Sequence, residues 1–262
     1  MRIVLSGISA ILILFFCNLA LGANSSAPKY SAVVVDANTR DILFADDEGK
    51  RLHPAGLTKL MTLYVAFKAI EDGEIGLDDK VIVSNHAASE APVKLGLRPR
   101  QKVRLRYLLR AAAVQGSNDA ATAIGEHIEG SEAAFARRMN RTAEDLGMTR
   151  STFRNAHGLT ETGQLSTAQD MAVLLLALNE EFPDYFNLFG RISTSAGIKT
   201  VRHSGRRLLS SDDRILGAKT GYTRASGFSG VSLSQTGSKK IITVVFGGRS
   251  TTTRNAQMHK LR

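Results

Sequence analysis

The stretch His53-Pro54-Ala55-Gly56-Leu57-Thr58-Lys59-Leu60-Met61-Thr62 decides the fold of this chain, because it opens a helix without a polar face. Pro54 suits the first turn of a helix, where its missing N–H would have no helical acceptor. Gly73 offers a stop, so the sequence predicts a helix that ends near Asp72. Apolar residues cover most of its faces: Leu57, Leu60, Met61, Leu63, Tyr64, Val65, Phe67 and Ile70. A helix that is apolar nearly all round is buried.

Lys59 lies among these apolar residues, where an unpaired ammonium is costly and where burial lowers the pKa of the amine. A lysine held neutral can act as a base. Residues three apart share one face of a helix, so position 56 lies beside Lys59. A serine at 56 would complete the S-x-x-K geometry of serine acyl transfer, but the residue is Gly56. A core lysine that extends its ammonium to solvent is the alternative interpretation of Lys59.

The segments on either side of this helix predict one sheet at the two ends of the chain. Strands are predicted upstream, over 30–35 and 41–45, and downstream, over 218–222, 227–233 and 239–246. Helices are predicted over 104–115, 119–128, 131–146, 167–178 and 251–262. Asp119 and Ser166 are the expected caps of the second and fourth of these helices. We therefore expect a layered α/β domain, in which helices flank the sheet and a helical subdomain lies beside it.

The N-terminus has the pattern of a secretory signal peptide. Arg2 precedes an apolar stretch over 3–21, and small residues then predict cleavage after Gly22 or Ala23. An uncleaved membrane anchor is the alternative. The single cysteine, Cys17, lies inside this segment, so the mature protein is expected to have no thiol, disulfide or cysteine-based metal site. We expect a signal peptide over 1–23, one domain over 24–262, and a periplasmic or extracellular location.

Composition narrows the classes of partner. The chain has 262 residues, of which 43% are apolar and 22% charged, and this excludes a disordered protein. Its net charge of +10 would suit nucleic acid, but export removes that partner. Cell-wall polymers and lipid headgroups remain as anionic partners, and a solvated basic surface is the plain alternative. No two histidines have the spacing of metal ligands, so no metal and no cofactor are expected.

Three segments carry a family resemblance. The opening stretch resembles H-P-A-S-L-T-K-x-M-T of the low-molecular-mass D-alanyl-D-alanine carboxypeptidases, penicillin-binding proteins of the peptidase S11 type, and Gly56 replaces the serine. Gln115-Gly116-Ser117-Asn118-Asp119-Ala120-Ala121 resembles their S-G-N-D-A stretch. Ala218-Lys219-Thr220-Gly221-Tyr222-Thr223 resembles their K-T-G-[FY]-T segment. The resemblance implies a β-lactamase/D,D-peptidase-like fold, with a mainly antiparallel five-stranded sheet, flanking helices and a helical subdomain.

The resemblance also implies a role for each motif. In the family, the serine attacks the carbonyl between the terminal D-alanines of a peptidoglycan stem peptide, and the motif lysine, here Lys59, is the base. The motif asparagine, here Asn118, holds the substrate amide. The strand that carries Lys219, Thr220 and Gly221 pairs with the substrate, and its lysine and threonine receive the terminal carboxylate. The backbone N–H groups of the nucleophile position and of Tyr222 form the oxyanion hole.

The departures from the family pattern affect bond-making. Gly56 has no hydroxyl, and loss of a serine nucleophile costs about a million-fold in turnover. Gly116 takes the place of the motif serine, and Ser117, the middle residue, could lie in the cleft. Gly56 is either an engineered inactivation or a natural loss, and the second departure favours natural loss. The expected function is a carboxypeptidase-family protein, impaired or inactive. A non-catalytic peptide-binding or regulatory pseudoenzyme, with non-covalent β-lactam binding, is the alternative; a β-lactamase would need the same serine.

Two further expectations concern the C-terminal part. Arg249 and Arg254 either bind anionic substrate ends or lie exposed to solvent. Members of the family often add a β-rich second domain and a membrane-associating amphipathic helix. Neither follows before Arg262, so we expect no C-terminal β domain and no stable C-terminal membrane anchor.

Overall fold

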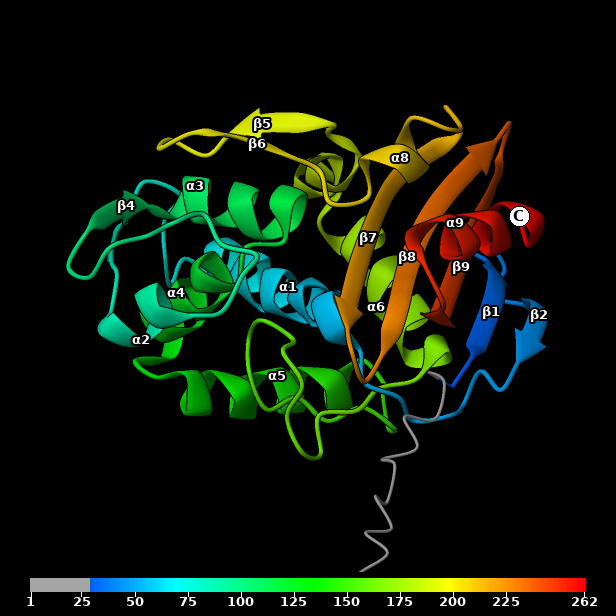
Figure 1. Ribbon diagram of the computed structural model, residues 1–262, viewed down its shortest axis with the longest axis horizontal. Helices are drawn as coiled ribbons and strands as arrows, with labels where there is room; N and C mark the ends of the chain where they lie inside the picture. The colour runs from blue at the N-terminus through cyan, green and yellow to red at the C-terminus, as the bar shows by residue number, and fades with distance from the viewer. Residues whose placement is uncertain (1–28) are drawn as a thin grey trace, which may run out of the picture.

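The computed structural model describes residues 29–262, and the predicted signal peptide and Cys17 lie outside them (Figure 1). The sheet predicted from the two ends of the chain is confirmed: it is antiparallel, with the strand order β2-β1-β9-β8-β7. Its strands are β1 (Ser31–Asp36), β2 (Ile42–Asp46), β7 (Ile215–Thr223), β8 (Gly227–Thr236) and β9 (Lys239–Gly248). The two ends of the chain meet where β1 pairs with β9, from Ser31 opposite Phe246 to Asp36 opposite Ile241.

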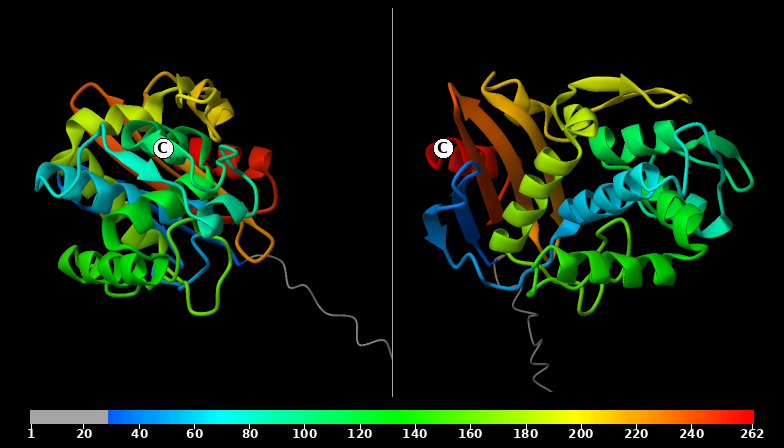
Figure 2. Two further views of the ribbon diagram at one scale, coloured as in Figure 1. Left: turned by 90° about the vertical axis from the view of Figure 1, so that its left-hand side faces the viewer. Right: turned by 180° about the vertical axis from the view of Figure 1, so that it is seen from behind.

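Helices cover both faces of the sheet. α6 (Ala168–Glu181) packs on one face and α9 (Thr251–Lys260) on the other, as the front and back views show (Figures 1 and 2). A helical part lies beside the sheet, built from η1 (Ala55–Leu57), α1 (Thr58–Glu71), α2 (Asn85–Ser89), α3 (Leu105–Arg110), η2 (Ala111–Gln115), α4 (Asn118–Glu129) and α5 (Glu132–Asp145). The expected layered α/β domain with a helical subdomain is therefore confirmed.

The remaining elements are short. They are α7 (Pro183–Phe186), η3 (Asn187–Gly190), α8 (Arg206–Leu209) and two small hairpins, β3–β4 (Lys80–Ile82 and Lys102–Arg104) and β5–β6 (Ser193–Ser195 and Thr200–Arg202). The sequence did not predict these hairpins, because three-residue strands are too short to establish an alternating pattern. Among residues 29–262, no helix combines the length and the apolar composition that crossing a membrane requires.

The predicted buried helix is the centre of the core. Every side chain of α1 from Thr58 to Phe67 is buried, and its apolar residues join one continuous cluster with those of the other helices and the sheet. The helix begins against β7 and extends into the helical part, so it connects the two halves of the molecule (Figure 1). The N-terminal end of α1 is thereby held against an edge strand of the sheet.

Two predicted helix caps are wrong. Ser117 is the N-cap of α4, and the Asp119 carboxylate instead accepts hydrogen bonds from the backbone N–H groups of residues 95, 96 and 97 at 2.8–3.0 Å. Thr167, not Ser166, caps α6, because its hydroxyl accepts from the N–H of Asp170. Asp119 therefore anchors a loop, which is a tertiary contact that the sequence around it does not reveal.

Removing the Asp119 carboxylate is expected to destabilise the protein. Asp119→Ala leaves the backbone N–H groups of the buried residues Leu95 and Leu97 without an acceptor, at a cost of about 1–3 kcal/mol for each group, while the N–H of Gly96, an exposed residue, can bond to water. We expect a loss of at least about 2 kcal/mol in the free energy of unfolding, measured by urea denaturation. Asp213→Ala, an exposed matched control, is expected to change it by less than about 0.5 kcal/mol. Equal stability of the two variants would contradict this reading.

Candidate active site

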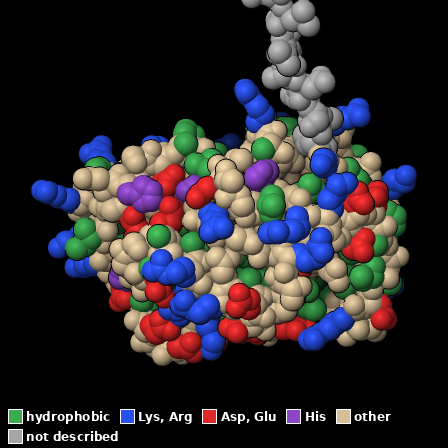
Figure 3. Space-filling model, turned by 90° about the horizontal axis from the view of Figure 1, so that it is seen from below, with side chains coloured by type: hydrophobic (Ala, Val, Ile, Leu, Met, Phe, Trp, Pro, Cys, Tyr) green, Lys and Arg blue, Asp and Glu red, His purple; other side chains and the backbone are tan. Residues whose placement is uncertain are grey.

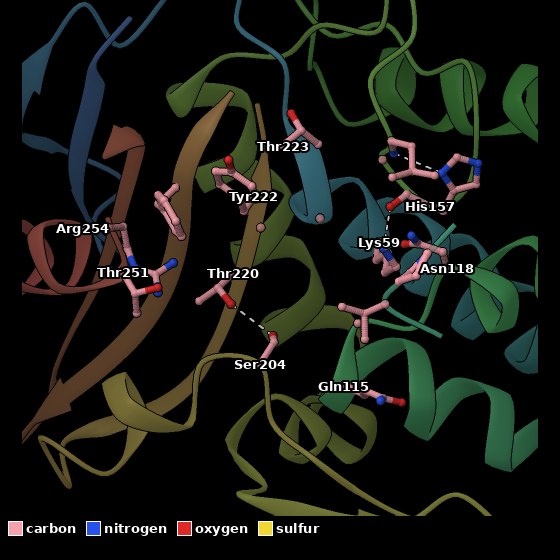
Figure 4. Close-up of a pocket in the computed structure, with 18 residues that line it drawn as sticks. Lys59, Gln115, Asn118, His157, Ser204, Thr220, Tyr222, Thr223, Thr251 and Arg254 are labelled. Atoms are coloured by element: carbon pink, nitrogen blue, oxygen red, sulfur yellow. Dashed lines mark hydrogen bonds between the residues drawn. The ribbon is translucent and has the colours of Figure 1, made fainter. Parts of the chain in front are cut away.

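A cleft of about 320 Å³ lies where the N-terminal end of α1 meets the edge strand β7 (Figure 4). Most of the sequence-predicted site residues line it: Gly56, Lys59, Gly116, Asn118, Thr220, Gly221 and Tyr222. Two predicted residues, Ser117 and Lys219, are not part of its lining. The cleft thus brings together segments that are far apart in the sequence, because α1, α4 and β7 converge there.

Gly56 lies in tight contact with β7. A Cβ atom at this position would lie 2.9 Å from the carbonyl oxygen of Thr220 and 3.1 Å from the Cα atom of Gly221. The approach is equally close from the other side, because a Cβ atom on Gly221 would lie 2.4 Å from the backbone nitrogen of Gly56. Position 56 is in the first turn of the helical segment, where backbone N–H groups have no intrahelical acceptor. The site therefore offers a backbone donor at position 56 and no room for a side chain unless β7 shifts.

The Lys59 amine is buried beside Gly56. The residue is only 2% exposed, and its Nζ donates hydrogen bonds to Oδ1 of Asn118 at 2.7 Å and to the backbone carbonyl of His157. Burial lowers the pKa of Lys59 to about 7, although the charges of Glu90 and Asp119 oppose this shift. The amine is therefore partly neutral near physiological pH, as a base requires. The alternative of a lysine that reaches solvent is wrong, because the amine is enclosed.

Asn118 connects the lysine to the segment that follows α2. Its Nδ2 donates to the carbonyl of Ala91 at 2.8 Å while its Oδ1 accepts from Lys59. Figure 4 shows the side chains of Lys59 and Asn118 and the backbone carbonyl of His157 converging on the helical side of the cleft. The oxygen and the nitrogen of the Asn118 amide are thus both hydrogen-bonded to other groups of the protein.

The structure does not place the Lys219 ammonium in the cleft. Lys219 is fully buried, and its Nζ donates to the carbonyls of Ala112 and Ala113 at 2.8 and 2.9 Å. Burial and then the nearby Lys59 charge lower its pKa well below the ordinary value. A Cβ atom on Gly116 would lie 3.4 Å from this nitrogen, so Gly116 forms the layer between Lys219 and the cleft. Direct contact of Lys219 with a ligand carboxylate, as the resemblance implies, would need this layer to move.

Ser117 does not enter the cleft, so it cannot supply the missing hydroxyl in this arrangement. The residue is fully buried, and its hydroxyl donates to Oε1 of Gln115 at 2.8 Å. Gly116, which precedes it, has a φ of +82°, a left-handed conformation that favours glycine. This backbone turn directs the side chain of Ser117 away from the cleft lining, while Gln115, Gly116 and Asn118 remain in it.

The other wall of the cleft is polar and cationic. Thr220 Oγ1 donates to Ser204 Oγ at 3.1 Å, and the guanidinium of Arg254 lies on the same side (Figure 4). Arg254 is 2% exposed, and burial lowers its pKa to about 10, so it stays charged at neutral pH. Its Nη1 donates to the carbonyl of Ser229, and no ion pair with an acidic residue is found for it among residues 29–262. Arg249 is exposed and outside the lining.

Several residues of the cleft were not predicted from the sequence, and three of them form contacts within it. His157 contributes the carbonyl that accepts from Lys59, Ser204 bonds to Thr220, and Phe228 packs against Tyr222 with ring centroids 4.4 Å apart. The sequence around His157 gives no indication that its backbone carbonyl would accept a hydrogen bond in the site. Ser204 and Phe228 lie outside the motifs and enter the site through the tertiary fold.

Known proteins of similar sequence and structure share one description. D-alanyl-D-alanine carboxypeptidase DacF of Bacillus subtilis (strain 168) is 34% identical over 236 residues, which cover 88% of this chain and 60% of that protein. DacD of Escherichia coli (strain K12) is 34% identical over 237 residues, covering 88% and 61%. This chain therefore spans less than two thirds of the length of these relatives.

Solved structures agree with this match. Penicillin-binding protein 6B from Escherichia coli superimposes with a TM-score of 0.80 at 33% identity, covering 90% of this chain and 76% of that one. DacD from Francisella tularensis has a TM-score of 0.84 at 27% identity, covering 97% and 72%. The expected β-lactamase/D,D-peptidase-like fold class is confirmed. A D-alanyl-D-alanine carboxypeptidase family model also matches residues 23–250. By this match, and by the converging motifs, the chain belongs to the D-alanyl-D-alanine carboxypeptidase family, peptidase S11.

Proposed function

We propose that this chain binds peptidoglycan stem peptides that end in D-Ala-D-Ala and does not form the acyl-enzyme on which turnover in its family depends. One observation carries the proposal: the nucleophile position is a glycine packed against β7, while the walls that would hold a peptide remain. The ligand class is proposed from family membership. Because peptidoglycan lies outside the inner membrane, the proposal includes an exported location. A carboxypeptidase of residual activity is the neighbouring possibility that the experiments below separate from binding alone.

Arg254 is the proposed receptor for the terminal carboxylate. A buried guanidinium without an anionic partner carries an unmet desolvation cost. A carboxylate can accept two parallel hydrogen bonds from a guanidinium, which makes such a pair strong and directional. The hydroxyls of Thr220 and Thr251 line the same wall and would add donors. Lys219 lies behind the lining of the cleft, so it would support this wall without touching the peptide carboxylate.

β7 is the proposed seat for the backbone of the peptide. It is the last strand of the five-stranded sheet, so one of its edges lacks a neighbouring strand. An extended peptide can bind such an edge by adding one strand, and main-chain hydrogen bonds then supply affinity. Residues 220–223 of β7 line the cleft, so a peptide bound there would pass directly over Gly56.

The chemical half of the site is the part proposed to be lost. Lys59 has the lowered pKa of a base, but within residues 29–262 its amine forms no hydrogen bond with a hydroxyl from which it could take a proton. Thr58 offers no replacement, because its hydroxyl is buried outside the cleft lining on the side of Gly158. Without a nucleophile, turnover about a million-fold below that of an intact serine enzyme is expected.

The binding claim predicts that affinity depends on the carboxylate of the peptide. Titration of the purified chain with diacetyl-L-Lys-D-Ala-D-Ala, followed by NMR, should show saturable binding. Amidating the C-terminus of the peptide should weaken binding at least tenfold, or about 1.4 kcal/mol, and Arg254→Gln should do the same. Arg249→Gln is the matched control, since this exposed arginine lies outside the cleft. Equal affinity for the acid and the amide would refute the proposed receptor.

The chemical claim predicts that a serine at position 56 restores covalent reaction. Intact-mass analysis after incubation with benzylpenicillin should detect no adduct on the present chain and a slowly formed adduct on Gly56→Ser. The Cβ atom would lie 2.9 Å from the Thr220 carbonyl, so this variant should also lose about 1–3 kcal/mol of stability. Gly49→Ser, at a position with open space around it, is the control for both effects. A stable adduct on the unmodified chain would mean that acylation occurs without a serine at position 56, which would contradict the chemical claim.

The lowered pKa of Lys59 is measurable directly. In protein labelled with ¹³C-lysine, one side-chain resonance should titrate near pH 7 and disappear in Lys59→Met. Lys68, which pairs with Asp72 and whose pKa is raised, serves as internal control. The unfolded chain keeps this proton up to the ordinary pKa of 10.5, so Lys59 makes the free energy of unfolding rise with pH between about 7 and 10.5. A Lys59 midpoint above pH 9 would exclude a base at this position.

A further inference from the structure

A cluster of histidine and acidic side chains lies on the helical part, behind the wall of the cleft that holds Lys59. His86 comes from α2, Glu90 follows that helix, Glu126 comes from α4 and Glu132 from α5. One ligand atom each of His86, Glu90 and Glu132 can be chosen so that all lie within 4.8 Å of one another. Figure 3 shows histidine side chains adjoining acidic ones toward the left of the face seen from below.

The His86 ring is oriented as metal-binding imidazoles are. Its Nδ1 lies 3.0 Å from Oε1 of Glu126, so a neutral ring that donates from Nδ1 would present the lone pair of Nε2 to a metal ion. Nε2 faces Oε1 of Glu90 and Oε2 of Glu132, each at 3.7 Å. These distances are too long for hydrogen bonds. They are close to the spacing of about 3.3 Å that bonds of about 2.0–2.1 Å impose on the ligands of a tetrahedral zinc ion.

The two carboxylates are held by an outer layer of donors. Oε1 of Glu132 accepts from the backbone N–H of Ala156 at 3.0 Å, and Oε1 of Glu90 accepts from the hydroxyl of Thr122 at 2.9 Å. Nε2 of His157 lies 3.3 Å from the same oxygen of Glu90, and Nδ1 of His157 accepts from Leu159, so Nε2 is the protonated nitrogen. Outer donors of this kind fix the geometry of metal ligands.

Among residues 29–262, the acidic side chains of the cluster face His86 and have no lysine or arginine as an ion-pair partner. The side chain of Glu90 is 8% exposed, and no hydrogen bond reaches its Oε2 among residues 29–262. In the same part of the chain, Oε2 of Glu126 is buried without a partner, and no lysine or arginine forms an ion pair with Glu90, Glu126 or Glu132. Buried carboxylates that lack a cation are costly unless something neutralises them.

We propose that His86, Glu90 and Glu132 bind one divalent cation of the zinc type, with water completing its coordination on the exposed side of His86. Mixed imidazole and carboxylate ligands suit zinc better than magnesium or calcium, which prefer oxygen alone. The prediction of no metal rests on the spacing of histidine pairs. The spacing that indicates this site is that of His86 and Glu90, which are four residues apart.

The cation would support the cleft. It would tie the α2 segment to α5 and, through Glu126, to α4. Glu90 directly precedes Ala91, whose carbonyl accepts from Asn118, and Pro92 and Val93 line the cleft. His157, which lies against Glu90, gives its carbonyl to Lys59. A bound cation would therefore fix the wall that positions Lys59 and Asn118, whether or not the site turns over substrate.

Calorimetric titration of zinc into the chelator-treated chain, purified without a polyhistidine tag, tests the site. One ion should bind per chain and raise the melting temperature, and magnesium should not compete. His86→Ala and Glu132→Gln should lower the affinity at least tenfold, and Glu126→Gln about 10–100-fold. His127→Ala is the matched control, because His127 lies on α4 beside Asp79, outside the cluster. X-ray absorption of the zinc complex should give nitrogen and oxygen ligands near 2.0–2.1 Å.

Two results would overturn the proposal: no saturable zinc binding to the unmodified chain, or unchanged affinity in both His86→Ala and Glu132→Gln. If His86 instead acts as a protonated ion-pair partner, its replacement would lower the melting temperature and zinc would have no effect, which is also a refutation. Glu90→Gln gives a second measure of ligand loss if a variant does not fold. None of these outcomes depends on peptide binding, so the site stands or fails separately from the proposed function.

Discussion

The burial of the Lys59 amine is the constraint on which the rest of the site depends. An amine enclosed at the start of a core helix needs acceptors, and it finds them in Asn118 on α4 and in the His157 carbonyl on the loop after α5. These contacts draw three separate parts of the chain to one point beside β7. Burial lowers the pKa of the amine, and the charges of Glu90 and Asp119 oppose part of this effect.

The tight contact between Gly56 and β7 gives this arrangement a different outcome from that of an intact serine enzyme. The base, the asparagine and the edge strand are present, but the place for the nucleophile is filled by backbone. Lys219 and Ser117 are turned away from the cleft, so Arg254 is the cation that lines it on the side of Thr220. Under the proposed function, binding and bond-making, which share one cleft in the family, would be separated in this chain.

The sequence predicted the sheet and the buried helix, and most of the site residues that it predicted line the cleft, because each depends on local patterns or on extended motifs. The start of α1, the turn at Gly116 and strand β7 can be identified because each carries several motif residues in the order found in the family. The failures that affect the site are tertiary. Asp119 was expected as a cap and instead anchors residues 95–97, Lys219 was expected in the cleft and is covered by Gly116, and the role of Ser204 depends on a loop that packs beside Thr220. No neighbouring residue in the sequence encodes such contacts.

A crystal structure of the chain with a bound D-Ala-D-Ala peptide tests the central claim most directly. The account predicts an uncleaved peptide along the free edge of β7, with its carboxylate at Arg254 and its penultimate carbonyl over Gly56. A peptide that has lost its terminal D-alanine, or an acyl group attached to any side chain of the cleft, would contradict it.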